Sequence, residues 1–107
     1  MSHPIAEERP VVHGDALNAL RAEIAGEPDP SAAAQRAVDM LHDRFGHYDW
    51  VGIYWVDANG TDLVLGPWIG PEATEHTRIP IGTGICGAAA ASGLTEIIED
   101  VNADPRY

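Results

Sequence analysis

The chain has 107 residues, 45% of them hydrophobic, and a formal net charge of -11 at pH 7. This length allows at most one domain with a modest hydrophobic core. All 6 basic residues are arginines, against 17 acidic residues, so the chain lacks the basic face that nucleic acid or an anionic membrane surface requires. No apolar run reaches the roughly 18–20 residues that span a bilayer. We therefore expect an acidic protein that binds a small-molecule ligand.

Cys86 is the only cysteine, so the chain cannot form an internal disulfide. No arginine-rich or apolar leader precedes the domain, and both observations favour a reducing cytoplasm. No histidine is spaced from a carboxylate or from Cys86 as metal ligands are spaced, so we expect no metal site.

Two helices are predicted in the N-terminal half, after a flexible segment. Residues 1–14 contain two prolines, mixed charges and few apolar residues, which is typical of a flexible lead-in. A short amphipathic helix is expected over 15–25 and a second over 31–45, with Ser31 as its N-cap. The apolar positions that indicate these helices are Leu17, Leu20 and Ile24 in the first, and Ala34, Val38, Leu41 and Phe45 in the second.

The second half alternates between strands and one helix. Residues 49–56 are rich in aromatic and β-branched residues, which indicates a strand. An Asn-Gly turn leads into a returning strand over 61–66, which Pro67 closes, and Trp68 follows in a loop. A strand, a helix and a strand are then expected at 77–81, 84–92 and 95–99. The pattern indicates one α+β domain over 15–107, built around a single sheet.

The chain stops at Tyr107, directly after a predicted strand and a turn. The resulting sheet would be thin, with exposed edges. We therefore expect this sequence to be part of a longer domain.

The turn that contains Cys86 is the most informative segment. Cys86 lies between glycines, just before the alanine run that predicts a helix. A thiol in the first turn of a helix feels the positive end of the helix dipole, and such thiols often become reactive. The same turn can bind an anion without any chemistry. A third interpretation is that Cys86 is a small, inert, buried residue.

The spacing Gly82-x-Gly84-x-x-Gly87 also matches the dinucleotide-binding fingerprint. We reject this interpretation because Pro80 is unsuited to a buried parallel strand. The following helix is also too short for a βαβ crossover.

Four segments occur in order and at close spacing: Asp49-Trp-Val-Gly-Ile-Tyr54, Leu63-Val-Leu-Gly-Pro67, Arg78-Ile-Pro-Ile-Gly-Thr-Gly-Ile-Cys-Gly87 and Ile98-Glu-Asp-Val-Asn102. From about Ser31 to Tyr107, the chain resembles the GAF-domain proteins of the free methionine-(R)-sulfoxide reductase family. The resemblance implies a GAF-like fold, in which a central antiparallel sheet has the N-terminal helices packed on one face and a ligand pocket on the other.

The resemblance also implies a reaction. A thiolate attacks the sulfoxide sulfur of free methionine sulfoxide, a second cysteine resolves the sulfenic acid as a disulfide, and thioredoxin restores the thiols. Trp50 and Tyr54 match the aromatic residues around the substrate's methyl and methylene groups. Residues at i and i+4 of a strand share a face, so both rings can line one surface, although both can also be ordinary core aromatics. Gly84 and Ile85 are expected to contact the substrate, and Cys86 to take part in catalysis.

This sequence departs from the family pattern in two ways. His76 stands where the family usually has a cysteine, ten residues before Cys86. The cysteine usually assigned the attack would fall beyond Tyr107. We therefore expect the chain alone to be inactive.

Two other functions remain open. The chain could be a GAF module that senses a small molecule without chemistry, using backbone N–H groups of the 82–87 turn. It could also act as a dimerisation module through its first helices, with a homodimer as the assembly. A further open point is whether His76 acts as an acid or base or is a solvated loop residue.

Overall fold

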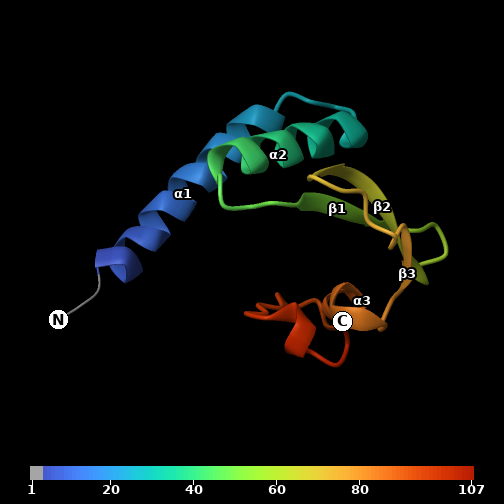
Figure 1. Ribbon diagram of the computed structural model, residues 1–107. Coiled ribbons are helices and arrows are strands. Elements are labelled where there is room, and N and C mark those ends of the chain that lie inside the picture. The colour runs from blue at the N-terminus through green and yellow to red at the C-terminus, as the bar shows by residue number, and fades with distance from the viewer. Residues whose placement is uncertain (1–3) are drawn as a thin grey trace. The chain divides into compact units, whose positions relative to one another are not determined.

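The computed structural model describes residues 4–107, with side chains from residue 14 onward. The elements in chain order are α1 (Pro4–Ile24), α2 (Pro30–Arg44), β1 (Val51–Val56), β2 (Asp62–Ile69), β3 (Arg78–Pro80), α3 (Gly84–Ser92) and the short 3₁₀ helix η1 (Val101–Ala103) (Figure 1). Helices and an antiparallel sheet confirm the predicted α+β class. The chain forms two compact units. The first contains the chain up to Ile53 together with Gly66–Glu72, and the second contains Tyr54–Leu65 and Ala73–Tyr107.

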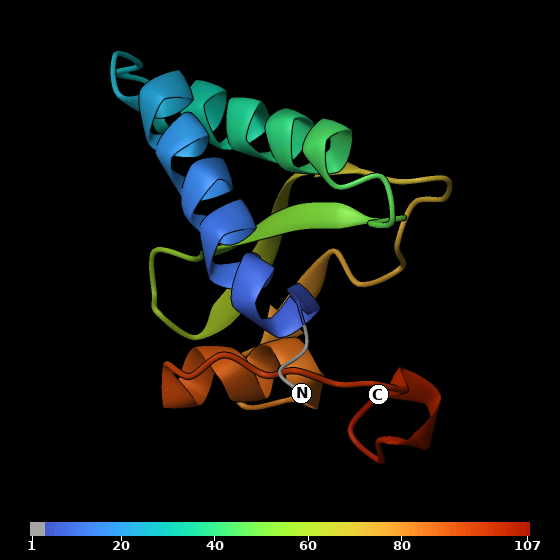
Figure 2. The same cartoon turned by 90° about the vertical axis from the view of Figure 1, so that its left-hand side faces the viewer.

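In the first unit, α1 and α2 lie side by side (Figure 2). α1 begins at Pro4 and not at residue 15, so the expected helix start is wrong. The prediction took Gly14 as a boundary, but a glycine inside a helix costs only about 1 kcal/mol relative to alanine and need not end it. Residues 1–3 of the predicted flexible segment lie outside the described residues, and the division at residue 14 stays a prediction.

α2 matches the predicted helix except at its N-cap. Asp29 is the N-cap, and its carboxylate accepts the backbone N–H groups of Ser31 at 3.4 Å and Ala32 at 3.3 Å. Pro30 occupies the first turn, where its fixed φ suits the helix and its missing N–H is not needed. The predicted cap at Ser31 is therefore wrong by two residues.

The apolar face of α2 lies where the spacing predicts it. Val38 is fully buried and Ala34 is 6% exposed. Together with Ala16 of α1, which is 5% exposed, they form the core of the first unit. An open apolar hollow between the helices is lined by Ala16, Leu17, Leu20, Leu41, Phe45 and Tyr48.

The sheet has the strand order β1-β2-β3. β2 and β3 are antiparallel, with Asp62 opposite Pro80, Leu63 opposite Ile79 and Val64 opposite Arg78. Leu63 is only 5% exposed and is the buried centre of the second unit.

β2 continues to Ile69, so the predictions that Pro67 closes the strand and that Trp68 lies in a loop are wrong. β3 pairs only with Asp62–Val64. Pro67 therefore lies beyond the part of β2 that pairs with β3. Its missing N–H removes no hydrogen bond between these two strands.

The strand predicted over 95–99 is not formed. A strand is defined by its pairing, and the sheet in residues 4–107 contains only β1, β2 and β3. The β-branched residues of this segment have no neighbouring strand with which to pair, and β propensity alone does not make a strand.

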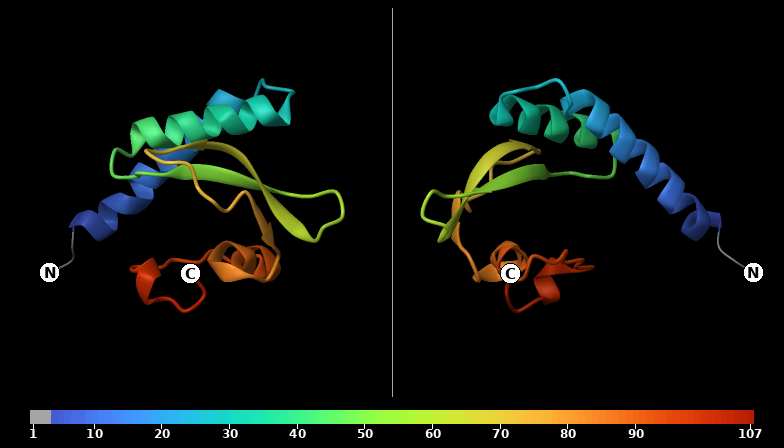
Figure 3. Two further views of the ribbon diagram at one scale, coloured as in Figure 1. Left: turned by 45° about the vertical axis from the view of Figure 1, so that its right-hand side comes forward. Right: turned by 180° about the vertical axis from the view of Figure 1, so that it is seen from behind.

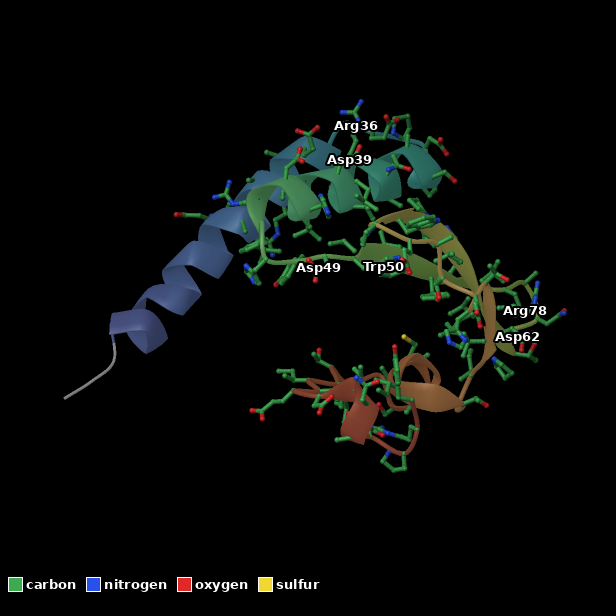
Figure 4. All side chains as sticks on the ribbon, viewed as in Figure 1. Arg36, Asp39, Asp49, Trp50, Asp62 and Arg78 are labelled. Carbon is green, nitrogen blue, oxygen red and sulfur yellow. The ribbon has the colours of Figure 1, made fainter. Side chains whose placement is uncertain are left out.

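An ion pair secures the hairpin between β1 and β2. Asp57 Oδ1 accepts the backbone N–H groups of Thr61 at 3.0 Å and Asp62 at 3.2 Å. Gly60 has a φ of 72°, as the Asn-Gly turn predicts. Arg78 Nη1 donates to Asp57 Oδ2 at 3.2 Å and to Asp62 Oδ2 at 3.0 Å, and Figure 4 shows Arg78 beside Asp62. The backbone N–H of Thr61, more than Arg78, lowers the pKa of Asp57. Arg78 thus ties the start of β3 to the hairpin.

Candidate functional site

A short turn connects β3 to α3 (Figure 3), and Cys86 lies just after this turn, in α3. Gly82 and Gly84 have φ values of 96° and 68°, which other residues rarely adopt. The N–H of Gly82 donates to the carbonyl of Gly87 at 2.8 Å, and the N–H of Thr83 donates to the carbonyl of Pro80 at 3.0 Å. These bonds fold the turn back against β3. The helix runs from Gly84 to Ser92, as predicted.

Cys86 is the third residue of α3, within its first turn. Its position therefore confirms the predicted helix terminus. The side chain is exposed, so the interpretation of Cys86 as a buried residue is wrong. Gly87, the next residue, is the buried one. It faces β3, and the chain can approach closely there because glycine has no Cβ.

Cys86 borders an open hollow of about 310 Å³ in the second unit. The hollow is lined mainly by apolar and turn residues, and its complete lining is His76, Ile79, Thr83, Gly84, Ile85, Cys86, Val101, Arg106 and Tyr107. Three of the five predicted site residues, Gly84, Ile85 and Cys86, therefore lie at one cavity. His76 lies at the same cavity.

Tyr54 lies next to this hollow. Its hydroxyl donates to the backbone carbonyl of His76 at 2.6 Å, which holds the 74–77 loop in place. Burial raises the pKa of Tyr54, the electrostatic influence of Cys86 raises it further, and a hydrogen bond with Thr74 partly opposes both. The hydroxyl therefore stays protonated at neutral pH and remains a hydrogen-bond donor.

Trp50, the fifth predicted site residue, belongs to the first unit and immediately precedes β1 (Figure 4). Its indole stacks on Trp68, with ring centroids 6.1 Å apart and planes 12° apart. Its Nε1 is buried and has no hydrogen-bond partner within the described residues. That Trp50 and Tyr54 line one substrate surface stays a prediction.

Sequence reasoning missed the wall of the hollow formed by Val101, Arg106 and Tyr107. Arg106 donates from Nε and Nη2 to the Asp104 carboxylate at 3.0 and 2.8 Å, and from Nη1 to Glu96. The Arg106 hydrogen bonds lower the pKa of Asp104 to about 2. These bonds link Arg106 to two carboxylates of the same C-terminal segment. The acidic and basic residues two positions apart at 104 and 106 are the sequence feature that could have indicated this ion pair.

Glu96 and Asp100, four residues apart, are both exposed and both have partners. Glu96 pairs with Arg106. Asp100 caps η1 by accepting the N–H of Asn102 at 3.1 Å. Both carboxylates therefore organise the loop beside the hollow.

The described part of the chain contains neither a cluster of metal ligands nor a helix that could cross a membrane. No group of three or more histidine, cysteine, aspartate or glutamate residues there is arranged to hold a metal ion. No helix within residues 4–107 combines the length and the apolar character that crossing a membrane requires.

Comparison with known proteins gives consistent matches. The GAF domain model matches residues 29–107. Protein YtsP of Bacillus subtilis is 40% identical over 91 residues, which cover 85% of this chain and 55% of that protein. The free methionine-R-sulfoxide reductase of Escherichia coli is 34% identical over 90 residues, which cover 84% of this chain and 52% of that protein. The chain thus spans about half the length of these relatives.

A solved structure is similar over the whole chain. It is the free methionine-R-sulfoxide reductase of Neisseria meningitidis in complex with its substrate. The TM-score is 0.77 at 37% identity, and the match covers 100% of this chain and 59% of that one. The family model spans α2, the sheet, the Cys86 turn and the C-terminal loop. The chain belongs to the GAF domain family.

Proposed function

We propose that this chain belongs to a GAF domain that reduces free methionine-(R)-sulfoxide. The observation that carries the proposal is the exposed thiol of Cys86 at a hollow that also contains Gly84 and Ile85. The similarity of the whole chain to a substrate-bound reductase supports it.

The proposed reaction consumes one sulfoxide and two thiols. A first thiolate attacks the sulfoxide sulfur, the oxygen is transferred to the thiol sulfur as a sulfenic acid, and methionine leaves. A second thiol then condenses with the sulfenic acid, forming a disulfide and releasing water. A thioredoxin-type dithiol reduces the disulfide and is itself oxidised. Because Cys86 is the only cysteine in the 107 residues, the other thiol must come from outside them.

We assign Cys86 the second thiol, which condenses with the sulfenic acid. The free backbone N–H groups at the start of α3, at Gly84 and Ile85, are suited to an oxygen of the substrate, because the first turn of a helix leaves its donors unpaired. Tyr54 and Trp50 supply aromatic surface for the methyl and methylene groups, since sulfur-bearing chains pack well on aromatic rings.

Partners and location follow from the same proposal. Thioredoxin is the proposed reductant, and the cytoplasm is the proposed compartment, where an exposed thiol stays reduced. The proposed assembly is a homodimer formed through α1 and α2. The open apolar hollow between these helices supports it, since Leu17 is 48% exposed and Tyr48 is 40% exposed there.

The test measures which epimer of free methionine sulfoxide the protein reduces. The protein that carries this chain is incubated with racemic free methionine sulfoxide and a thioredoxin system, and both epimers and methionine are measured by chiral chromatography. We expect loss of the R epimer alone. Cys86→Ser should retain the first turnover but lose steady-state turnover, because the sulfenic acid then lacks its second thiol. Ala90→Ser, at an exposed position of the same helix, is the matched control.

Three outcomes would contradict the proposal. Unchanged steady-state turnover in Cys86→Ser would refute the role of Cys86. Loss of the first turnover in that variant would make Cys86 the attacking thiol instead. Binding of the sulfoxide without any methionine formed would favour the sensory GAF module over the reductase.

A further inference from the structure

The indole of Trp50 lies directly over two glycines. A Cβ built on Gly52 would lie 2.2 Å from Cη2 and 2.5 Å from Cζ3 of the indole. A Cβ built on Gly70 would lie 2.3 Å from Cδ1 and 3.0 Å from Cγ. Gly52 therefore underlies the six-membered ring and Gly70 the five-membered ring. All three residues belong to the first unit.

No polar contact among the described residues explains this position. Trp50 Nε1 is buried, lacks an acceptor there, and would lie 3.2 Å from a Cβ at Gly70. A buried donor without a partner lowers stability, so the indole is not held here by hydrogen bonding. The indole also stacks on Trp68. The space left by the two glycines is what allows the ring to lie where it does.

Backbone conformation does not explain why positions 52 and 70 are glycine. The φ values of Gly52 and Gly70 lie outside the positive range, in which only Gly60, Gly82, Gly84 and Gly93 are found. Gly52 lies inside β1, where glycine weakens a strand because it offers no side chain to pack. A glycine in a strand often marks the close approach of another group. Here that group is the indole.

We infer that Gly52 and Gly70 are positioning residues that seat the Trp50 indole in the orientation used to bind the substrate. The inference rests on the proposed function, which assigns Trp50 to the methyl and methylene groups of free methionine sulfoxide. A methyl group at either glycine must rotate the ring, because real Cβ contacts do not fall below 3.0 Å. The rotation would break the stack on Trp68 and misalign the apolar surface.

The test uses Gly52→Ala and Gly70→Ala in the protein that carries this chain. Gly46→Ala is the matched control, since a Cβ at Gly46 meets nothing within 4 Å. The tryptophan exciton couplet in the circular dichroism spectrum reports the Trp50–Trp68 stack, and Trp68→Phe identifies it. We expect both glycine variants to fold, to lose the couplet and to bind methionine sulfoxide about three- to tenfold more weakly. KM should rise while kcat changes little, because the reacting thiols are untouched.

A double-mutant cycle separates positioning from general damage. Gly70→Ala is combined with Trp50→Ala, and affinity and unfolding free energy are measured for each variant. If the glycine acts through the ring, Gly70→Ala should have little further effect once the indole is absent. Additive losses in the cycle, or a couplet retained in both glycine variants, would overturn the inference. A wild-type protein that keeps the couplet but does not bind the sulfoxide would overturn the proposed function and the substrate part of the inference, whereas the couplet would still test the seating of the ring.

Discussion

Replacing Gly87 by alanine tests how the Cys86 turn is built. Gly87 is buried within α3, and a Cβ there would lie 2.7 Å from the carbonyl oxygen of Pro80. It would also lie 3.1 Å from the backbone nitrogen of Gly82. Both neighbours are backbone atoms of a turn closed by two hydrogen bonds. Neither can rotate aside, so α3 must move away from β3.

The expected effect opposes helix propensity. Alanine in place of glycine inside a helix normally raises the unfolding free energy by about 0.8–1 kcal/mol. Overpacking a tight contact lowers it by about 1–3 kcal/mol. Because the obstacle is backbone, we expect the second effect to win, so that Gly87→Ala loses up to about 2 kcal/mol net of the gain in helix propensity.

Urea denaturation followed by circular dichroism measures this difference, provided that the m-value is unchanged. Gly14→Ala is the matched control, because Gly14 lies inside α1 and a Cβ there meets nothing within 4 Å. That variant should gain about 0.5–1 kcal/mol. If Gly87→Ala is as stable as the wild type or more stable, the close packing of α3 against β3 is not what requires glycine, and the reasoning fails.

Three further predictions concern capping and titration. Asp29→Ala removes the α2 cap and should lower the unfolding free energy by about 1 kcal/mol in urea. The pKa of Asp104 is lowered to about 2 from 3.8, so its stabilisation is present above the ordinary value and is lost as pH falls towards 2. Arg106→Gln should therefore make urea midpoints fall less steeply between pH 4 and pH 2. Tyr54→Phe should remove the tyrosine that titrates above the ordinary pKa of 10 in ultraviolet absorbance, and a titration identical to the wild type would contradict the assignment.

Local patterns predicted the parts of the fold that local chemistry decides. The 84–92 helix is formed by an alanine run that ends at Gly93, whose φ of 72° is the left-handed cap. The Asn-Gly turn at 59–60 and the buried positions Ala34 and Val38 likewise follow from residue type and spacing. Each depends on neighbours within a few residues along the chain.

The predictions failed where the outcome depends on distant neighbours. Pro67 was interpreted as the end of a strand, yet it is tolerated because β3 pairs with β2 only at Asp62–Val64. The predicted strand at 95–99 has the right residue types but no strand beside it. The seating of Trp50 on Gly52 and Gly70 joins residues up to 20 positions apart, and no periodicity reveals such a contact.

The candidate site also has one part that local sequence predicted and another part that depends on distant residues. Spacing placed Gly84, Ile85 and Cys86 together, because they are consecutive residues of one turn. It could not show that the Tyr54 hydroxyl bonds to the His76 carbonyl beside them, or that Arg106 of the C-terminal loop lines the same hollow. These contacts need the tertiary fold.

The exposure of Cys86 removes one of its competing interpretations. A buried thiol would have explained a lone cysteine without any chemistry, but this side chain is accessible. The turn beneath it is held by the Gly82–Gly87 and Thr83–Pro80 hydrogen bonds, so the thiol has a fixed location. A thiol that is fixed and accessible can react with a sulfenic acid and then with an external dithiol without any rearrangement of its own helix. The proposed second-thiol role asks for both properties, whereas a sensory module would require neither.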